Sequence, residues 1–282
     1  MRFTWLAFSL AITLHAGSPY ETARKLFNAT DFEQSLKVLQ TIPDKNAAVY
    51  ELIGRDYFLL GEYKRASEAL EKAAQADPDS SEIALWAGRA FGRRAETSSM
   101  LTAPGFASRA RQYFERAVQL DPRNLDALSD LFEYYLEAPG FLGGGMDKAQ
   151  ATAQQISNID AGEGHWSQAK IAEKRKEYGS AEAQLRRAIE LSPQRVGRFI
   201  ELAKFLAKQG RYEEAEQSLA QAEKIAPSSP KLIYAKADLY IRNKRNLDVA
   251  KSLLIRYLSM NLSPDDPPRS EARKLLKQAQ GG

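Results

Sequence analysis

The sequence predicts an all-α solenoid of about seven antiparallel helix pairs, followed by a C-terminal capping helix. The segment "YELIGRDYFLLGEYKRASEALEKAAQADP", residues 50–78, shares its residue spacing with "FIELAKFLAKQGRYEEAEQSLAQAEKIAP", residues 199–227. The clearest units recur every 34 residues, a period typical of stacked helical hairpins. With 44% hydrophobic and 27% charged residues, the composition is that of an ordered globular chain.

Each unit carries the marks of two helices joined by a short turn. A small residue, Gly54 or Ala203, stands where two helices must approach closely, and larger apolar residues follow at helical spacing. A glycine, Gly61 or Gly210, marks the turn between the two helices. A proline ends the unit because it cannot continue a helix, and Ser80 or Asn124 then caps the next one.

The units follow one another in register and form a single domain over residues 17–282. The third unit is ten residues longer than the period, the fourth lacks a terminal proline, and the last slips by one residue. A polar-faced helix after the prolines at 267–268 is expected to cap the open end of the solenoid. The predicted boundaries are 18–46, 47–80, 81–124, 125–161, 162–195, 196–229 and 230–264, with the cap at 268–280.

The pattern resembles that of the tetratricopeptide repeat (TPR) family. The residues that carry the resemblance include Gly61-Tyr63-Ala66 and Gly210-Tyr212-Ala215, each followed at matched offsets by leucine, alanine and proline. The resemblance covers nearly all of the chain after residue 17 and implies a right-handed superhelix. It also implies a non-catalytic scaffold or adaptor whose concave groove, built mainly from the first helix of each unit, holds a partner protein.

The resemblance also implies which side chains face the groove. At the ninth and thirteenth positions of six units, eight of twelve residues are basic. A basic groove favours an acidic peptide segment or a free carboxylate. The alternative is that these cations only solvate an exposed face and pair with nearby acids. The eight predicted groove residues are Arg55, Arg89, Arg93, Lys170, Lys174, Lys204, Lys208 and Arg242.

No motif in the sequence indicates catalysis. The chain has no cysteine and only two histidines, and His165 has no nucleophile or paired carboxylate beside it in a recognisable motif. Trp86 and Trp166 are interpreted as packing residues rather than ligand anchors. The sequence therefore predicts no enzyme activity, no cofactor and no metal site. The basic stretch "IRNKRN", residues 241–246, lacks the interleaved aromatics of a nucleic-acid surface, so no nucleic-acid partner is expected.

The N-terminus resembles a secretory signal peptide over residues 1–16. Arg2 supplies a positive start, Trp5 to Leu14 an apolar run, and Leu14-His15-Ala16 a small-residue cleavage site. The apolar run is short for a membrane span. Export, to the periplasm in a Gram-negative-type cell, is therefore predicted, with an uncleaved membrane anchor as the alternative.

A second candidate surface is the glycine-rich loop "APGFLGGGMDKAQ", which begins at Ala138. It is predicted to be a lengthened turn inside the fourth unit, capped by Asp147, beside a second "APGF" at 103–106 in the enlarged turn of the third. Phe106 and Phe141 are expected to pack together as plugs. The predicted partner-binding residues of this loop edge are Phe106, Pro139, Phe141, Gly143, Gly144 and Gly145.

The alternative function is a small-anion or small-ligand module that uses loop 138–147. Met146 and Asp147 stand where a phosphate-binding loop needs lysine and a hydroxyl residue, which argues against a nucleotide. A similar Pro-Gly-Phe and glycine-rich insertion occurs in some TPR-like proteins, including eukaryotic regulators of microtubule dynamics. That short resemblance does not transfer a microtubule role to a chain with an apparent secretory signal.

Overall fold

A computed structural model describes residues 18–281, which form fifteen α-helices and one 3₁₀ turn and contain no strand. The predicted all-α solenoid of seven hairpins and a final helix is confirmed. The predicted signal peptide lies outside the described residues. The first helices of the hairpins, called A helices, are α1 (Pro19–Asn28), α3 (Ala47–Leu59), α5 (Ser81–Glu96), α7 (Leu125–Glu137), α9 (Ala161–Lys174), α11 (Val196–Lys208) and α13 (Pro230–Arg242). The second, called B helices, are α2 (Phe32–Gln40), α4 (Tyr63–Ala76), α6 (Ala103–Leu120), α8 (Met146–Ile159), α10 (Tyr178–Leu191), α12 (Tyr212–Ile225) and α14 (Leu247–Leu258). The last helix is α15 (Arg269–Gly281), and the 3₁₀ turn η1 is Gly140–Leu142.

The prediction that Ser80 and Asn124 cap helices is confirmed. The side chains of Ser80 and Asn124 accept the backbone N–H groups of Ile83 and Ala127, at the starts of α5 and α7. Each bond satisfies one of the N–H groups that the first turn of a helix leaves free. Side-chain caps of this kind begin every A helix except α11, and they help to fix the register of the repeats.

Within a hairpin, small residues let the two helices approach closely. A Cβ atom on Gly54 would lie 2.4 Å from the Cγ atom of Leu70, which is fully buried. In the sixth unit, Ala203, Ala215, Leu219 and Ala222 are likewise buried. One continuous core runs from Leu128 to Ala272, and smaller clusters fill the earlier hairpins. The repeated small residues therefore set the close packing of the whole stack.

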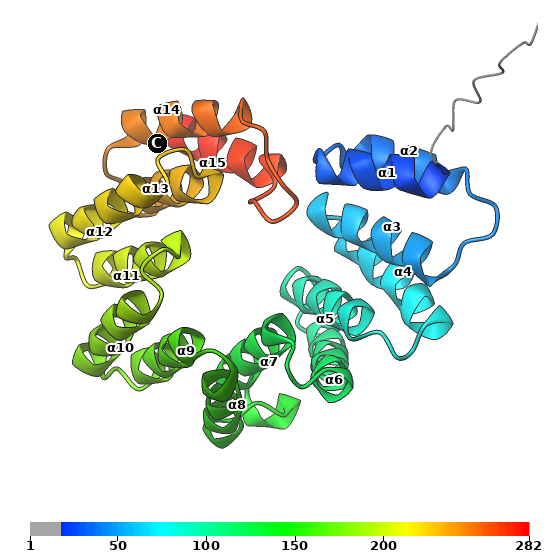
Figure 1. Ribbon diagram of the computed structural model, residues 1–282, viewed down its shortest axis with the longest axis horizontal. Helices are drawn as coiled ribbons and strands as arrows, with labels where there is room; N and C mark the ends of the chain where they lie inside the picture. Colours follow the sequence, from blue (N-terminus) through cyan, green and yellow to red (C-terminus); the bar gives the residue numbers. More distant parts are fainter. Residues whose placement is uncertain (1–17, 282) are drawn as a thin grey trace, which may run out of the picture.

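The hairpins follow one another around a nearly closed ring, with the A helices inside and the B helices outside (Figure 1). The first hairpin faces the segment between α14 and α15 across a narrow seam. A cavity of about 330 Å³ lies in this seam and is lined from both ends of the chain. The guanidinium group of Arg269 spans the seam and donates a hydrogen bond to the Thr30 hydroxyl.

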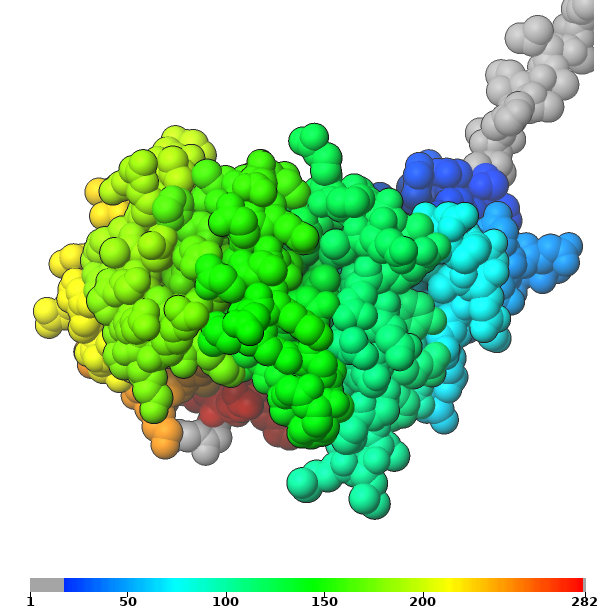
Figure 2. Space-filling model, turned by 90° about the horizontal axis from the view of Figure 1, so that it is seen from below, coloured from blue at the N-terminus to red at the C-terminus, as the bar shows by residue number. Residues whose placement is uncertain are grey.

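The third hairpin differs from the prediction. Its extra residues lengthen the helices to 16 residues in α5 and 18 in α6, and the second "APGF" is the first turn of α6 rather than part of the connection. The prediction was wrong because proline is compatible with the first turn of a helix, where its missing N–H has no partner to lose. The blue-green hairpin projects past its neighbours at the lower edge of Figure 2.

The loop after α7 lies between two helices of one hairpin, as the register predicts. The expectation that Asp147 caps α8 was wrong: Gly145 occupies the cap position, and Asp147 lies in the first turn. A carboxylate there still interacts favourably with the positive end of the helix dipole.

Candidate functional site

The eight predicted groove cations all lie on A helices, and each forms an ion pair with a carboxylate. The pairs are Arg55 with Glu51 and Glu82, Arg89 with Asp126 and Asp130, Arg93 with Glu96, Lys170 with Glu201, Lys174 with Glu137, Lys204 with Glu201, Lys208 with Glu173, and Arg242 with Asp238. We call this set of paired residues the concave ladder. Their role in partner binding stays a prediction.

Ion pairs of the concave ladder connect each A helix to the next one from α3 to α11. Arg55 on α3 lies 3.6 Å from Glu82 on α5, and Lys174 on α9 lies 2.6 Å from Glu137 on α7. Between α5 and α7, Arg89 Nε donates to Asp130 Oδ2 at 2.5 Å. The pairs Lys170–Glu201 and Lys208–Glu173 join α9 to α11 at 3.1 and 2.8 Å.

Sequence reasoning missed the acidic half of the concave ladder, although a signal for part of it was available. The cation at the ninth position of one unit meets an acid at the second or sixth position of the next. Examples are Arg55 with Glu82, Arg89 with Asp126 and Asp130, and Lys170 with Glu201. Comparing neighbouring units at these offsets would have predicted the pairs.

The ladder carboxylates are in different electrostatic environments. Burial disfavours the charge of Glu201, but the ammonium groups of Lys170 and Lys204 outweigh it and lower the pKa of Glu201 to about 2. At Glu133 on α7, burial and the adjacent Asp130 charge raise the pKa above its ordinary value. Glu133 makes no ion pair or hydrogen bond with the described part of the chain. The middle of the concave face therefore holds both tightly paired and uncompensated charge.

The two tryptophans differ in their surroundings. Trp86 on α5 is half-buried between the guanidinium groups of Arg55 and Arg89, 4.6 and 5.1 Å from its ring, and donates its indole N–H to Glu82 at 2.8 Å. Trp166 on α9 is buried, with its ring centre 5.9 Å from that of Phe132. Trp86 also packs against Phe58, with the two ring centres 5.4 Å apart. Both tryptophans are therefore packing residues, and Trp86 is in addition contacted by residues of the concave ladder.

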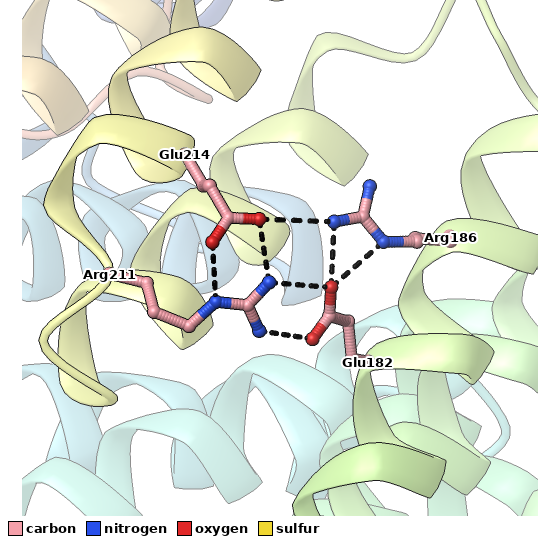
Figure 3. A network of polar contacts seen from close by, with 4 residues as sticks. All are labelled: Glu182, Arg186, Arg211 and Glu214. Atoms are coloured by element: carbon pink, nitrogen blue, oxygen red, sulfur yellow. Dashed lines mark hydrogen bonds and ion pairs between the residues drawn. The ribbon is translucent and has the colours of Figure 1, made fainter.

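A second link between neighbouring hairpins joins the N-terminal parts of the B helices α10 and α12 (Figure 3). Arg211, which precedes α12, donates hydrogen bonds to Glu214 on α12 and to Glu182 on α10. Arg186 on α10 donates to the same Glu182 at 2.6 Å. The Arg211 hydrogen bond lowers the pKa of Glu182 despite partial burial. This network holds two B helices together, as the concave ladder holds the A helices.

No catalytic arrangement is found among residues 18–281. The Nδ1 atom of His165 lies 2.6 Å from the Gln184 side-chain oxygen, and no group of three or more metal-ligating side chains is found in this part of the chain. Nor does any of its helices combine the length and the apolar character that crossing a bilayer requires.

The glycine-rich loop uses its own N–H groups to hold its shape. The N–H groups of Gly143, Gly144 and Gly145 donate to the carbonyls of Gly140, Pro139 and Tyr135, respectively. The hydroxyl of Tyr134 and the ammonium of Lys148 bond to the loop carbonyls of Leu142 and Gly143. Because these three N–H groups are occupied, they are not free to bind an anion.

The predicted loop-edge residues are not all brought together. Phe141 and Pro139 lie on the loop, and Phe141 is 81% exposed, so it does not plug the core. Phe106 lies within α6, stacked on Phe91 and covered by the guanidinium of Arg94. The structure adds two residues that the sequence analysis missed, Met100 and Leu101 in the α5–α6 connection, which are 93% and 94% exposed. The feature of the sequence that could have identified them is the run of uncharged residues at 97–108, in which both lie.

Comparisons with known proteins agree with this architecture. Two family models described as tetratricopeptide repeat match the chain, at residues 172–239 and 51–94. The comparison with curated protein sequences gave no match.

Solved structures share the fold at low identity. The chain is similar to a tetratricopeptide repeat protein from Parabacteroides merdae, with 15% identity, a TM-score of 0.56, and coverage of 94% of this chain and 100% of that one. It also resembles the C-terminal part of a TPR repeat-containing protein from Cytophaga hutchinsonii, with 17% identity, coverage of 91% of this chain and 99% of that one, and a TM-score of 0.49. A third similar structure is pilF of Pseudomonas aeruginosa, with 17% identity, coverage of 81% of this chain and 96% of that one, and a TM-score of 0.45. The chain thus carries tetratricopeptide repeats, and the first of these likenesses supports the fold alone.

Proposed function

We propose that this chain is an exported, non-catalytic scaffold that holds a segment of another protein against the concave ladder, in the cell envelope. The observation that carries the proposal is the ring of A helices, whose inner face displays charged and aromatic side chains in successive hairpins. Such a surface offers many weak, exchangeable contacts, as repeat proteins use to hold extended partners.

The concave ladder is suited to sharing its exposed cations with a partner. Lys208 and Arg242 are 63% and 75% exposed, so carboxylates of an acidic segment can reach them without unfolding any helix. The acids paired with these cations, Glu173 and Asp238, are only 23% and 14% exposed, so a partner carboxylate would share each cation and leave the existing ion pair in place. The fit to an acidic segment is therefore strongest at α11 and α13.

Two further features support the proposal. The signal-like residues 1–16 support export, and N-terminal sequencing of the mature protein would distinguish cleavage from an uncleaved anchor. The loop edge supplies a second surface, because Phe141 is exposed on a loop fixed by hydrogen bonds to its own backbone. An aromatic side chain presented in this way is suited to the centre of a protein interface.

The test is affinity capture from envelope extracts with the full chain and two double variants. Lys208→Glu/Arg242→Glu reverses the exposed groove charges, whereas Lys37→Glu/Lys224→Glu makes the same change on exposed positions of the B helices α2 and α12. We expect the groove variant to capture at least about tenfold less partner than the unchanged chain, because two attractive contacts become repulsive. Equal capture by both variants would exclude the groove as the binding surface.

A further inference from the structure

The α5–α6 hairpin has an unusual tip. Its helices contain 16 and 18 residues, whereas no other described helix exceeds 14. The tip therefore extends beyond the neighbouring hairpins (Figure 2). Its side chains Met100 and Leu101 are almost fully exposed. Two adjacent large apolar side chains held in water at a projecting position call for a function.

The tip is also free of charge over a long stretch. Residues 97–108, "TSSMLTAPGFAS", contain no charged residue in a chain that is 27% charged. Of the other A–B connections, only the glycine-rich loop 138–145 is likewise uncharged; those at 29–31, 60–62, 175–177, 209–211 and 243–246 each carry charge. A projecting connection without charged residues can enter an apolar environment without the free-energy cost of moving ionic groups out of water.

Arginines surround the base of this uncharged tip. Arg93 and Arg94 lie in the last turn of α5, Arg109 and Arg111 follow in α6, and Glu96 is the only acid between residues 93 and 111. Arg94 and Arg109 lie over the rings of Phe106 and Phe91, each with its guanidinium carbon 4.1 Å from the ring centre, so both are fixed in place. Arg109 also pairs with Glu71, Arg111 with Glu115, and Arg93 with Glu96.

The spacing between tip and arginines matches the depth of a bilayer interface. Arg109 is six residues beyond the start of α6 at Ala103, which corresponds to about 9 Å along the helix. Apolar side chains of interfacial elements enter the boundary between headgroups and acyl chains to about 5–10 Å. Basic residues at that distance meet the anionic headgroups, and arginine is suited to phosphate oxygens.

We propose that the α5–α6 tip is a membrane-contact element, which inserts Met100 and Leu101 into a bilayer containing anionic lipid while the basic residues at its base meet the headgroups. Among these, Arg94 forms no ion pair with the described residues, and its guanidinium group is held by Ser67 and the Phe106 ring. A projecting tip enters a fluid interface without a preformed partner cavity, and the surrounding charge is complementary to anionic lipid. The proposal does not depend on what the groove binds.

The chain has no cysteine, so a single environment-sensitive fluorophore can be attached at a chosen site of the full chain. Ser99→Cys places it beside the tip, and Ser259→Cys places it between α14 and α15 as a control. With vesicles of phosphatidylglycerol and phosphatidylethanolamine, we expect a blue shift at position 99 and none at position 259. The site-specific signal separates tip insertion from any adsorption through residues 1–16.

A second pair of variants tests the side chains themselves. In the Ser99→Cys background, Met100→Ser/Leu101→Ser is expected to weaken the vesicle-induced shift by about tenfold or more, because two apolar side chains no longer enter lipid. Val249→Ser/Ile255→Ser, the same change on exposed positions of α14, is expected to leave it unchanged. Phosphatidylcholine vesicles and high salt should reduce the shift, because both weaken attraction to the arginines.

Three results would overturn the proposal. One is the absence of a shift at position 99 with anionic vesicles. Another is an equal shift at position 259, which would mean adsorption through a different face. The third is a vesicle-induced shift that Met100→Ser/Leu101→Ser leaves unchanged. If the same variant also captured less protein from envelope extract, the tip would bind a pocket of a protein instead.

Discussion

At the scale of single residues, Gly144 is the position in the glycine-rich loop that tolerates change least. A Cβ atom there would lie 1.9 Å from the carbonyl oxygen of Ala138, which is backbone and cannot rotate away. We therefore expect Gly144→Ala to lower the free energy of unfolding by at least about 2 kcal/mol in chemical denaturation. Gly140→Ala in the same loop meets no atom within 4 Å and should change it by less than about 0.5 kcal/mol. Equal stability of the two variants would contradict the loop geometry.

Asp56 on α3 is a buried carboxyl group that forms no ion pair with the described residues. Ser35 on α2 donates a 2.7 Å hydrogen bond to one carboxyl oxygen, and the other oxygen has no partner among the described residues. Burial raises the pKa of Asp56 to about 8, with a small additional rise from Glu33 on α2 and opposing effects of Ser35 and Arg55. The neutral acid is therefore the form that the native packing favours.

The pH dependence follows from this pKa. Between the unfolded pKa near 4 and the folded value of about 8, the native state holds a proton that the unfolded state has released. The stability due to the neutral acid is complete below pH ~4 and is lost as the pH rises to about 8. Asp56→Asn, which stays neutral, should flatten this slope in denaturation curves between pH 5 and 9. The exposed Asp248→Asn should keep the wild-type slope, and a wild-type curve without the slope would contradict the assignment.

At the scale of elements, the concave ladder joins helices that are far apart in sequence. Arg89 contacts Asp126 and Asp130 on α7 and lies over the Trp86 ring, so its removal leaves the half-buried Asp130 uncompensated. Arg89→Ala should lower the free energy of unfolding by about 1–3 kcal/mol. Arg187→Ala removes an exposed pair with Glu190 within one helix and should cost about 0.5 kcal/mol or less. Comparable losses in the two variants would show that the ladder is only a solvated surface.

The elements also show what the sequence can and cannot predict. The hairpins were predictable because Gly54, Ala203 and similar small residues recur at fixed offsets and each unit packs mainly on its neighbours. The length of the third unit was predictable, but the placement of its extra residues was not, since Pro104 fits a connection and a first helical turn equally well. The pairing of Arg89 with Asp130 depends on how two A helices face each other, which a single unit's pattern does not contain.

At the scale of the whole molecule, the A helices form the inside of a ring closed by a limited contact. Arg269 donates to Thr30 across the seam, and the cavity beside it separates the two ends. In addition, the final helix α15 packs against α13 and α14 at the closing end of the ring. A partner segment therefore meets a surface enclosed on several sides, which favours an extended chain over a globular domain.

The central claim is that a partner protein lies against the concave face. The most direct measurement is site-specific photo-crosslinking in envelope extract, with p-benzoylphenylalanine in place of Glu133 on α7 or Lys224 on the outer helix α12. Glu133 lies on the inner helix α7 near the ladder residues Lys170 and Glu201 and keeps part of its surface in water, whereas Lys224 is exposed on the outer helix α12 (Figure 1). We predict a discrete protein adduct from position 133 and none from position 224. Adducts only from position 224, or from neither position, would contradict the claim.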